Sequence, residues 1–99
     1  MKTTVELSDQ VLTIVRSLAP DPRRALRAGL RQLAEGRGDI KQLEGELADW
    51  CRLRVKSYRV IFRYEIEGSQ RVARCAFAER RELVYELFAE TIRHLLEEE

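Results

Sequence analysis

Apolar and polar residues alternate with two different periods along this chain. Residues 1–7 alternate weakly at every second position, as in a β-strand, and the alternation stops at Ser8. Ser8 is also a suitable N-cap for a helix that continues to Leu18 and that Pro20 closes. The pattern therefore predicts a first strand followed by a short helix.

A second amphipathic helix is predicted directly after the first. Asp21 supplies the cap, and Pro22 occupies the first turn, where proline is favoured. Its apolar positions with helical spacing are Leu26, Leu30 and Leu33. Gly36 and Gly38 stop this helix. Two short helices joined by a tight turn form a hairpin, which needs a flat apolar surface to cover.

The second half of the chain predicts the surface that this hairpin covers. Residues 40–49 have helical residue types but contain Gly45, and we expect an irregular lead-in there. Every second residue is then apolar through three successive segments, which predicts strands. The strands are expected at residues 51–55, 58–64 and 72–78, with a bend at Lys56 and Ser57 and a hairpin turn at Gly68 and Ser69. Residues 80–98 return to helical spacing and predict a final helix.

The order of these elements defines the expected fold. It is an α+β fold with a small antiparallel sheet, an N-terminal helical hairpin on one face and a C-terminal helix, and the other face of the sheet is partly free. The length of 99 residues suits one domain, so we expect residues 1–99 to form a single domain.

Composition narrows the class of protein. Apolar residues make up 44% and charged residues 35% of the chain, which is typical of a soluble globular protein. No apolar run is long enough to span a membrane, and the start MKTTVELSDQ lacks the apolar core of a signal peptide. We therefore expect a cytoplasmic protein without a membrane partner. Cys51 and Cys75 lie among apolar neighbours without metal-ligand spacing, so we expect free thiols, with no metal and no cofactor.

The cations are clustered, although the formal net charge is only +1. Residues 51–81 contain nine Lys and Arg residues against three acidic ones, whereas the rest of the chain contains nine against fourteen. A basic block in a near-neutral chain indicates a local site for a polyanion or an acidic partner.

The stretch RLRVKSYRVIFRY, residues 52–64, holds the densest part of this block. Alternation places Arg52 and Arg54 on the same exposed side of one strand, and Arg59 can lie beside them on the next. Guanidinium groups match phosphate oxygens and stack on bases, so these side chains could hold a phosphodiester. The alternative is that they only solvate the outer side of a half-buried strand, where arginine is common.

A second candidate feature is AERRELVYELF, residues 78–88. Arg80 and Arg81 lie where the last strand meets the last helix, and Tyr85 follows one turn later. These residues could add cations and a base-stacking aromatic ring to the same face of the sheet. Alternatively, Tyr85 is only the first core aromatic residue of the helix.

Taken together, these segments resemble the RelE/ParE superfamily of toxins from bacterial toxin–antitoxin pairs. The similarity covers nearly the whole chain, and its most specific parts are RLRVKSYRVIF and the closing RRELVYE. The resemblance implies the α+β fold described above and a cognate antitoxin protein as partner. It also implies one of two activities, because RelE-like members cut mRNA in the ribosomal A site whereas ParE-like members inhibit DNA gyrase.

The residues of this chain favour the RelE-like branch. RelE-like cleavage uses two basic residues on one strand, an arginine on the next, an arginine before the last helix and a tyrosine in its first turn. The matching positions here are Arg52, Arg54, Arg59, Arg80 or Arg81, and Tyr85.

The resemblance implies metal-free cleavage of mRNA on the ribosome. The ribose 2′-OH attacks the adjacent phosphate and gives a cyclic phosphate and a 5′-OH. The three strand arginines would stabilise the phosphoryl oxygens of the transition state. Arg81 or, alternatively, Arg80 would act at the leaving group, and Tyr85 would stack on a base.

The chain departs from the family pattern at the proton acceptor. Relatives often carry lysine or histidine there, whereas arginine keeps its proton at any working pH and is a poor general base. Glu79 stands where many relatives have histidine and could accept the proton, or it could be only a surface carboxylate near the helix cap. Two alternatives therefore stay open: a ParE-like gyrase inhibitor, and a catalytically weak protein that only binds an antitoxin.

Overall fold

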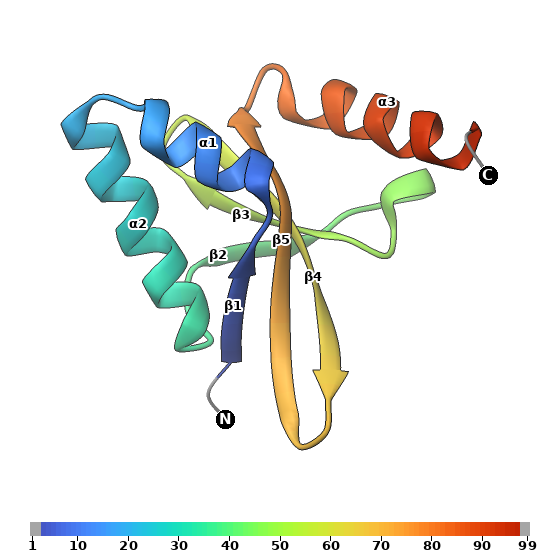
Figure 1. The fold of residues 1–99 in the computed structure, drawn as a ribbon, viewed down its shortest axis with the longest axis horizontal. Coiled ribbons are helices and arrows are strands. Elements are labelled where there is room, and N and C mark those ends of the chain that lie inside the picture. Colours follow the sequence, from blue (N-terminus) through green and yellow to red (C-terminus); the bar gives the residue numbers. More distant parts are fainter. Residues whose placement is uncertain (1–2, 98–99) are drawn as a thin grey trace.

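A computed structural model describes residues 3–97 of the chain, with side chains as far as His94. Within this range three α-helices and a short 3-10 helix accompany a single five-stranded sheet (Figure 1). The elements in chain order are β1 (Thr3–Leu7), α1 (Asp9–Ser17), α2 (Pro20–Ala34), β2 (Asp39–Gln42), the 3-10 helix η1 (Gly45–Leu47), β3 (Cys51–Val55), β4 (Tyr58–Glu67), β5 (Gln70–Arg80) and α3 (Val84–Glu97). The α+β class is confirmed. The predicted strand start at Met1 and helix end at Glu98 lie outside the described residues.

The sheet has the strand order β1-β5-β4-β3-β2, and its pairs are antiparallel except for β1, which runs parallel to β5. The prediction of an irregular lead-in over residues 40–49 is wrong in part, because residues 39–42 form the edge strand β2. Only Ile40 of β2 points into the core, and its other residues are exposed. A four-residue edge strand with one inward side chain has too little hydrophobic alternation to be recognised in the sequence.

The start of α1 agrees with the predicted cap, whereas the start of α2 does not. The Ser8 hydroxyl accepts a hydrogen bond from the Val11 amide at 3.3 Å, as an N-cap does. Pro20, expected to close the first helix, is instead the first residue of α2, and Ala19 is the cap. Proline suits that position, because the amide it lacks has no partner in a first turn.

The helical hairpin of α1 and α2 covers one face of the sheet, which we call the hairpin face. Its core consists of Val11, Val15, Leu26, Leu30, Leu33, Leu53, Val60, Phe62, Ala73, Cys75 and Ala78. Helix α2 packs tightly against β3 at Gly29, where a Cβ atom would be 2.5 Å from Cγ2 of Val55. Glycine therefore sets the approach of α2 to the sheet. Cys51 and Cys75 are free thiols, as expected, and burial raises the pKa of the Cys75 thiol to about 12.

Helix α3 packs on the opposite face of the sheet, which we call the α3 face. Its core is smaller and contains Leu47, Ile61, Val84 and Phe88. Trp50 contacts Phe88 edge to face, with ring centroids 4.8 Å apart. Because β5 continues to Arg80, α3 begins four residues later than the predicted helix. None of the helices within residues 3–97 combines the length and apolar character needed to cross a membrane.

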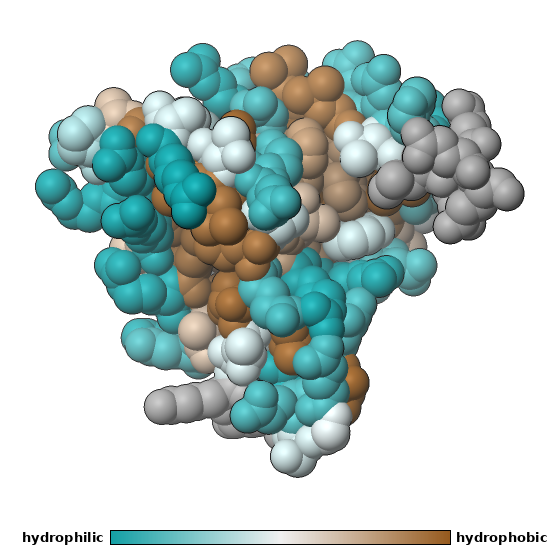
Figure 2. Space-filling view, in the orientation of Figure 1, coloured by the Kyte–Doolittle hydropathy of each residue, from teal (hydrophilic) through white to brown (hydrophobic). Residues whose placement is uncertain are grey.

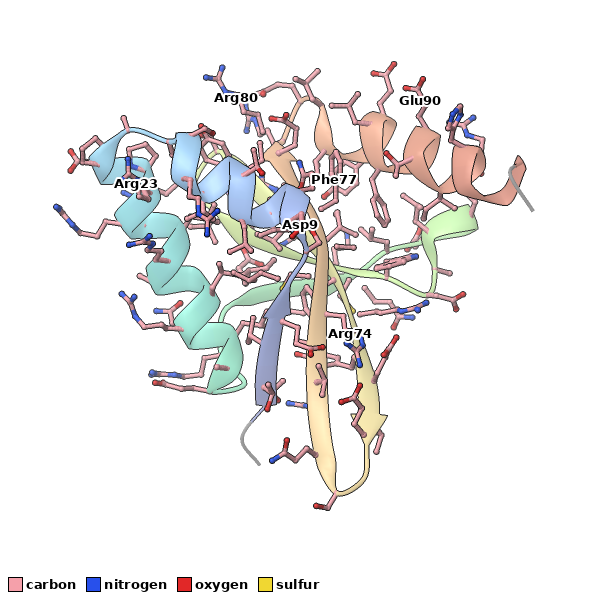
Figure 3. The ribbon with its side chains drawn as sticks, in the orientation of Figure 1. Asp9, Arg23, Arg74, Phe77, Arg80 and Glu90 are labelled. Carbon is pink, nitrogen blue, oxygen red and sulfur yellow. The ribbon has the colours of Figure 1, made fainter. Side chains whose placement is uncertain are left out.

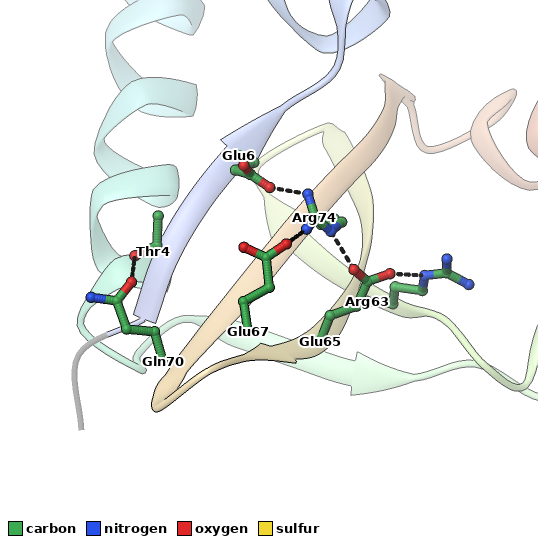
Figure 4. A network of polar contacts seen from close by, with 7 residues as sticks. All are labelled: Thr4, Glu6, Arg63, Glu65, Glu67, Gln70 and Arg74. Atoms are coloured by element: carbon green, nitrogen blue, oxygen red, sulfur yellow. Dashed lines mark hydrogen bonds and ion pairs between the residues drawn. The ribbon is translucent and has the colours of Figure 1, made fainter.

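An ion-pair network fills the part of the α3 face nearest the β4–β5 hairpin (Figure 4). Arg74 on β5 binds the carboxylates of Glu6, Glu65 and Glu67, which come from β1 and β4. Arg63 donates to Glu65 at 3.0 Å. The hydrogen bond and charge of Arg74 hold the pKa of the Glu65 carboxyl below its ordinary value. The network thus ties β1 to the long hairpin through charge.

Candidate active site

A row of four charged residues crosses the sheet on the α3 face. Strand register places Asp39 of β2 opposite Arg54 of β3, Arg54 opposite Arg59 of β4, and Arg59 opposite Glu79 of β5. Residues directly opposite in antiparallel strands point to the same side of the sheet. We call these residues the charged row. Two cations therefore lie side by side, with a carboxylate at each end.

Arg52 lies on the same face, two residues before Arg54 on β3, but it is already engaged. Its Nη1 donates to Oδ1 of Asp39 at 3.1 Å and to the Asp39 carbonyl oxygen at 3.0 Å. The Arg52 side chain is only 16% exposed. A phosphate that approaches Arg52 must therefore compete with Asp39.

Arg59 is buried, with 8% of its surface exposed, and the expectation that it lies on an exposed face is wrong. Its Nη1 donates to the carbonyl oxygens of Lys56 and Tyr58 at 2.8 and 2.9 Å. Lys56 has a positive φ of 55°, which turns the chain between β3 and β4. The guanidinium thus satisfies the carbonyl groups of this turn. Among the described residues, its Nε and Nη2 have no hydrogen-bond partner.

Arg80 and Arg81 diverge at the end of β5. Arg80 is opposite Tyr58 on β4. Tyr58 points to the same side of the sheet as Val60, two residues further along the strand, and Val60 belongs to the core of the hairpin face. Arg80 therefore starts from the hairpin face and not from the α3 face. The Arg81 amide donates to the Ser57 carbonyl at 2.9 Å, which fixes this residue beside the β3–β4 turn. Its side chain is 64% exposed. Register therefore separates Arg80 from the three strand arginines, whereas the bond to Ser57 holds the Arg81 backbone at the β3–β4 turn, whose carbonyl groups Arg59 binds.

Tyr85 lies in the first turn of α3 and is 37% exposed. Its neighbours Val84 and Phe88 supply the buried contacts of the helix. The alternative reading of Tyr85 as a core aromatic residue is therefore wrong. Its partly exposed ring could stack on a base.

Two groups at the site were not found from the sequence. Asp39 and Lys41 reach the α3 face only because β2 pairs with β3, and β2 was not predicted. Glu79 was recognised as a possible proton acceptor, and its position opposite Arg59 places it in the charged row. Its Oε2 accepts the Arg80 amide at 2.8 Å. Among the described residues, no three His, Cys, Asp or Glu side chains are grouped so that they could hold a metal ion.

Comparison with known proteins supports the fold. No protein-family model matches the chain, and no curated protein sequence matches it either. Solved structures do match. The RelBE2 toxin–antitoxin complex from Mycobacterium tuberculosis has 22% sequence identity and a TM-score of 0.67, covering 82% of this chain and 100% of that chain. The archaeal RelE–RelB complex from Pyrococcus horikoshii has 26% identity and a TM-score of 0.60, covering 82% of this chain and 97% of that chain.

A third match is the YoeB/ParE toxin from Agrobacterium tumefaciens, with 15% identity and a TM-score of 0.57, covering 80% of this chain and 99% of that chain. All three are toxins, or complexes of a toxin with its antitoxin. The chain therefore has the fold of RelE-like toxins.

Proposed function

We propose that this protein is the toxin of a type II toxin–antitoxin pair and that it cleaves mRNA in the ribosomal A site. The observation that carries the proposal is the pairing of Arg54 with Arg59 on the α3 face, with Arg52 on the same strand as Arg54. Like charges directly opposite one another are unfavourable in a sheet. An arrangement of this kind suits a site whose ligand supplies negative charge.

The proposed reaction needs no metal. The 2′-oxygen of a ribose forms a bond to the adjacent phosphorus while the bond from phosphorus to the 5′-oxygen breaks, leaving a 2′,3′-cyclic phosphate and a 5′-OH. The 2′-OH loses a proton to an acceptor, and the 5′-oxygen gains one. Negative charge grows on the phosphoryl oxygens during the step, so fixed guanidinium groups stabilise the transition state more than the ground state.

Each site residue has a proposed role. Arg59 orients the phosphate through its remaining N–H groups. The two hydrogen bonds that hold its guanidinium against the carbonyl groups of the turn support this role. Arg54 and Arg52 stabilise the phosphoryl oxygens, Arg81 stabilises the leaving oxygen, with Arg80 as a less favourably placed alternate, and Tyr85 stacks on a base.

Glu79 is the proposed proton acceptor of the protein. It is the carboxylate in the charged row that has no arginine side chain bonded to it among the described residues, whereas Asp39 is bonded to Arg52. A carboxylate beside a bound phosphate can take the 2′-OH proton. The ribosome would supply the remaining alignment, since correct positioning alone can contribute a large share of such a rate enhancement.

An antitoxin is the second proposed partner. Strands β1 and β2 are the two edges of the sheet, and an added strand from a partner can pair with either edge. An acidic antitoxin segment would also be attracted to Arg54 and Arg81, which are exposed. Two of the matched structures are complexes of a RelE-like toxin with its antitoxin, which supports this proposal.

A second candidate function is antitoxin binding without chemistry. It is favoured by the engagement of Arg52 with Asp39 and by the burial of Arg59, which together leave few free cations at the site. Controlled expression in bacteria separates the candidates. The endonuclease stops translation within minutes, a gyrase inhibitor causes DNA damage while translation continues, and a binding protein without chemistry leaves growth unchanged.

A further inference from the structure

Helix α2 carries a stripe of arginines on its outer side, away from the sheet. The members are Arg23, Arg24, Arg27 and Arg31, which we call the α2 stripe. Positions 23, 27 and 31 are four residues apart and therefore lie on one side of the helix. An open depression of about 290 Å³ is lined by Pro20 and all four arginines. Figure 3 shows nitrogen-tipped side chains, Arg23 among them, along the outer side of α2.

The stripe is poorly neutralised by the protein itself. Arg23 is held by the Leu18 carbonyl, to which its Nη2 donates at 2.8 Å. Among the side chains that the structure describes, Arg24 pairs with Asp21 alone, at 3.5 Å, and both side chains are largely exposed. Within residues 3–97, Arg27 and Arg31 are exposed and have no ion-pair partner. Asp21 is the only acidic residue in α2, so the stripe keeps a net positive charge.

A merely solvated helix face would be expected to look different. Like charges four residues apart destabilise a helix, whereas alternating acidic and basic residues stabilise it. The pairs Arg23 with Arg27 and Arg27 with Arg31 are both repulsive. A bound polyanion removes this repulsion. The stripe is therefore better explained as a binding surface for a polyanion than as a solvated helix face.

The composition of the stripe favours a phosphate backbone over a protein surface. The large hydrophobic residues exposed within the described chain are Ile66, Leu83 and Tyr85, and none of them belongs to α2. Protein interfaces usually have an apolar centre, which the stripe lacks. Figure 2 shows hydrophilic surface over the outer side of α2. Arginines four residues apart are spaced by about 6 Å along a helix, which lets neighbouring side chains reach successive phosphates.

We infer that the α2 stripe binds the phosphate backbone of double-helical RNA. This surface is separate from the charged row, because α2 covers the hairpin face and the charged row lies on the α3 face. The protein would then bind structured RNA through α2, while the charged row on the α3 face binds the mRNA substrate. The choice of RNA over DNA rests on the proposed function, whereas the phosphate contact itself does not.

The test is the salt dependence of binding to a blunt RNA duplex, measured by fluorescence anisotropy with the full chain. The variants are Arg27→Gln and the double variant R27Q/R31Q, with Arg93→Gln on α3 as the control that removes the same charge as the single variant. For each phosphate that a variant no longer neutralises, the slope of log K against log salt should fall in magnitude by roughly 0.7–0.9. Because Arg27 and Arg31 are exposed, the variants should keep the circular dichroism spectrum of the parent protein.

We expect the slope to fall by about 0.7–0.9 in the single variant and by about twice that in the double variant, with no change in Arg93→Gln. Equal changes in all variants would mean that only net charge matters and would overturn the inference. So would tighter binding to a DNA duplex of the same sequence, or binding to polyglutamate without binding to RNA. This binding measurement does not require cleavage. A failure of the α2 stripe to bind RNA can therefore be distinguished from a failure of the proposed endonuclease activity.

Discussion

Arg54 and Arg59 lie directly opposite each other on β3 and β4, yet Arg54 is exposed and Arg59 is buried. Two arginines that look equivalent in the sequence therefore have different environments and different structural roles. Arg59 supports the turn at Lys56 and Tyr58, whereas Arg54 makes no comparable contact among the described residues. Loss of activity after substitution means different things at the two positions.

Arg59→Ala should destabilise the fold, whereas Arg54→Gln should not. Removing the Arg59 guanidinium leaves part-buried carbonyl groups without their donor, which costs about 1–3 kcal/mol. A substitution at an exposed position such as Arg54 usually changes stability by less than about 0.5 kcal/mol. Urea denaturation of both variants measures the difference. Equal stabilities would show that Arg59 has no structural role, and it would then serve as the simpler probe of the site.

Asp39→Asn should make the site a better anion binder. The substitution removes the carboxylate that engages Arg52 and frees its guanidinium for phosphate. A partly exposed ion pair is worth about 0.2–1 kcal/mol, which corresponds to an increase of up to about fivefold in affinity or cleavage rate. The matched control is Asp9→Asn on α1, which removes the same charge from the hairpin side. A decrease at Asp39 alone would indicate that this carboxylate helps the reaction.

Much of the fold was predictable because its elements bury regular apolar patterns. The alternation in residues 51–64 predicted β3, the start of β4 and the turn between them, and α2 followed from its three leucines. Strand β2 could not be predicted, since a short edge strand buries almost nothing. The parallel pairing of β1 with β5 was also missed, because neither strand carries a signal for its partner's direction.

The sequence predicted where the site residues lie, but not how deeply they are buried or which groups they bind. Alternation placed Arg52 and Arg54 on one face of the sheet and allowed Arg59 to lie beside them on the next strand, and the register of β3 with β4 pairs Arg54 with Arg59 on that face. Burial of Arg59 and pairing of Arg52 depend on a turn conformation and on β2, and both are tertiary features. The α2 stripe was hidden for another reason: outside residues 51–81 the chain contains nine basic residues against fourteen acidic ones, so a count over that whole region does not show the local cluster of arginines on α2.

Gly29→Ala should destabilise the protein although alanine favours helices. The new methyl group would meet Cγ2 of Val55 at 2.5 Å, and overpacking of this kind costs about 1–3 kcal/mol, at or above the gain of about 1 kcal/mol in helix propensity. Val55→Ala should relieve the clash, so the double variant should be more stable than the two single effects predict. Additive effects in thermal or urea unfolding would contradict this account of the approach of α2 to β3.

Glu65→Gln should reduce stability at neutral pH but not in acid. The folded protein holds the pKa of Glu65 below its ordinary value of 4.5, chiefly through the hydrogen bond from Arg74. A lowered pKa in the folded state stabilises the protein above the unfolded pKa, and this contribution disappears as the pH falls through the folded pKa. The difference in urea midpoint between parent and variant should therefore be largest near pH 7 and shrink below about pH 4.5.

The control for this experiment is Glu90→Gln on α3, an exposed carboxylate for which no ion pair occurs in the described part of the chain. Its urea midpoint should follow that of the parent protein at every pH. A difference for Glu65→Gln that stays constant with pH would mean that the ion pairs of Arg74 do not contribute to stability.

The most direct test of the central claim is cleavage of a defined message in a purified bacterial translation system, with 5′ ends mapped on ribosome-bound mRNA. The proteins to compare are the parent, Arg54→Gln, Tyr85→Phe and Arg93→Gln as a control. We expect new 5′-hydroxyl ends at A-site codons with the parent and the control, and a strong loss of these ends with Arg54→Gln. Tyr85→Phe, which keeps the ring, should retain them. Intact mRNA and uninterrupted translation with the parent protein would contradict the proposed endonuclease.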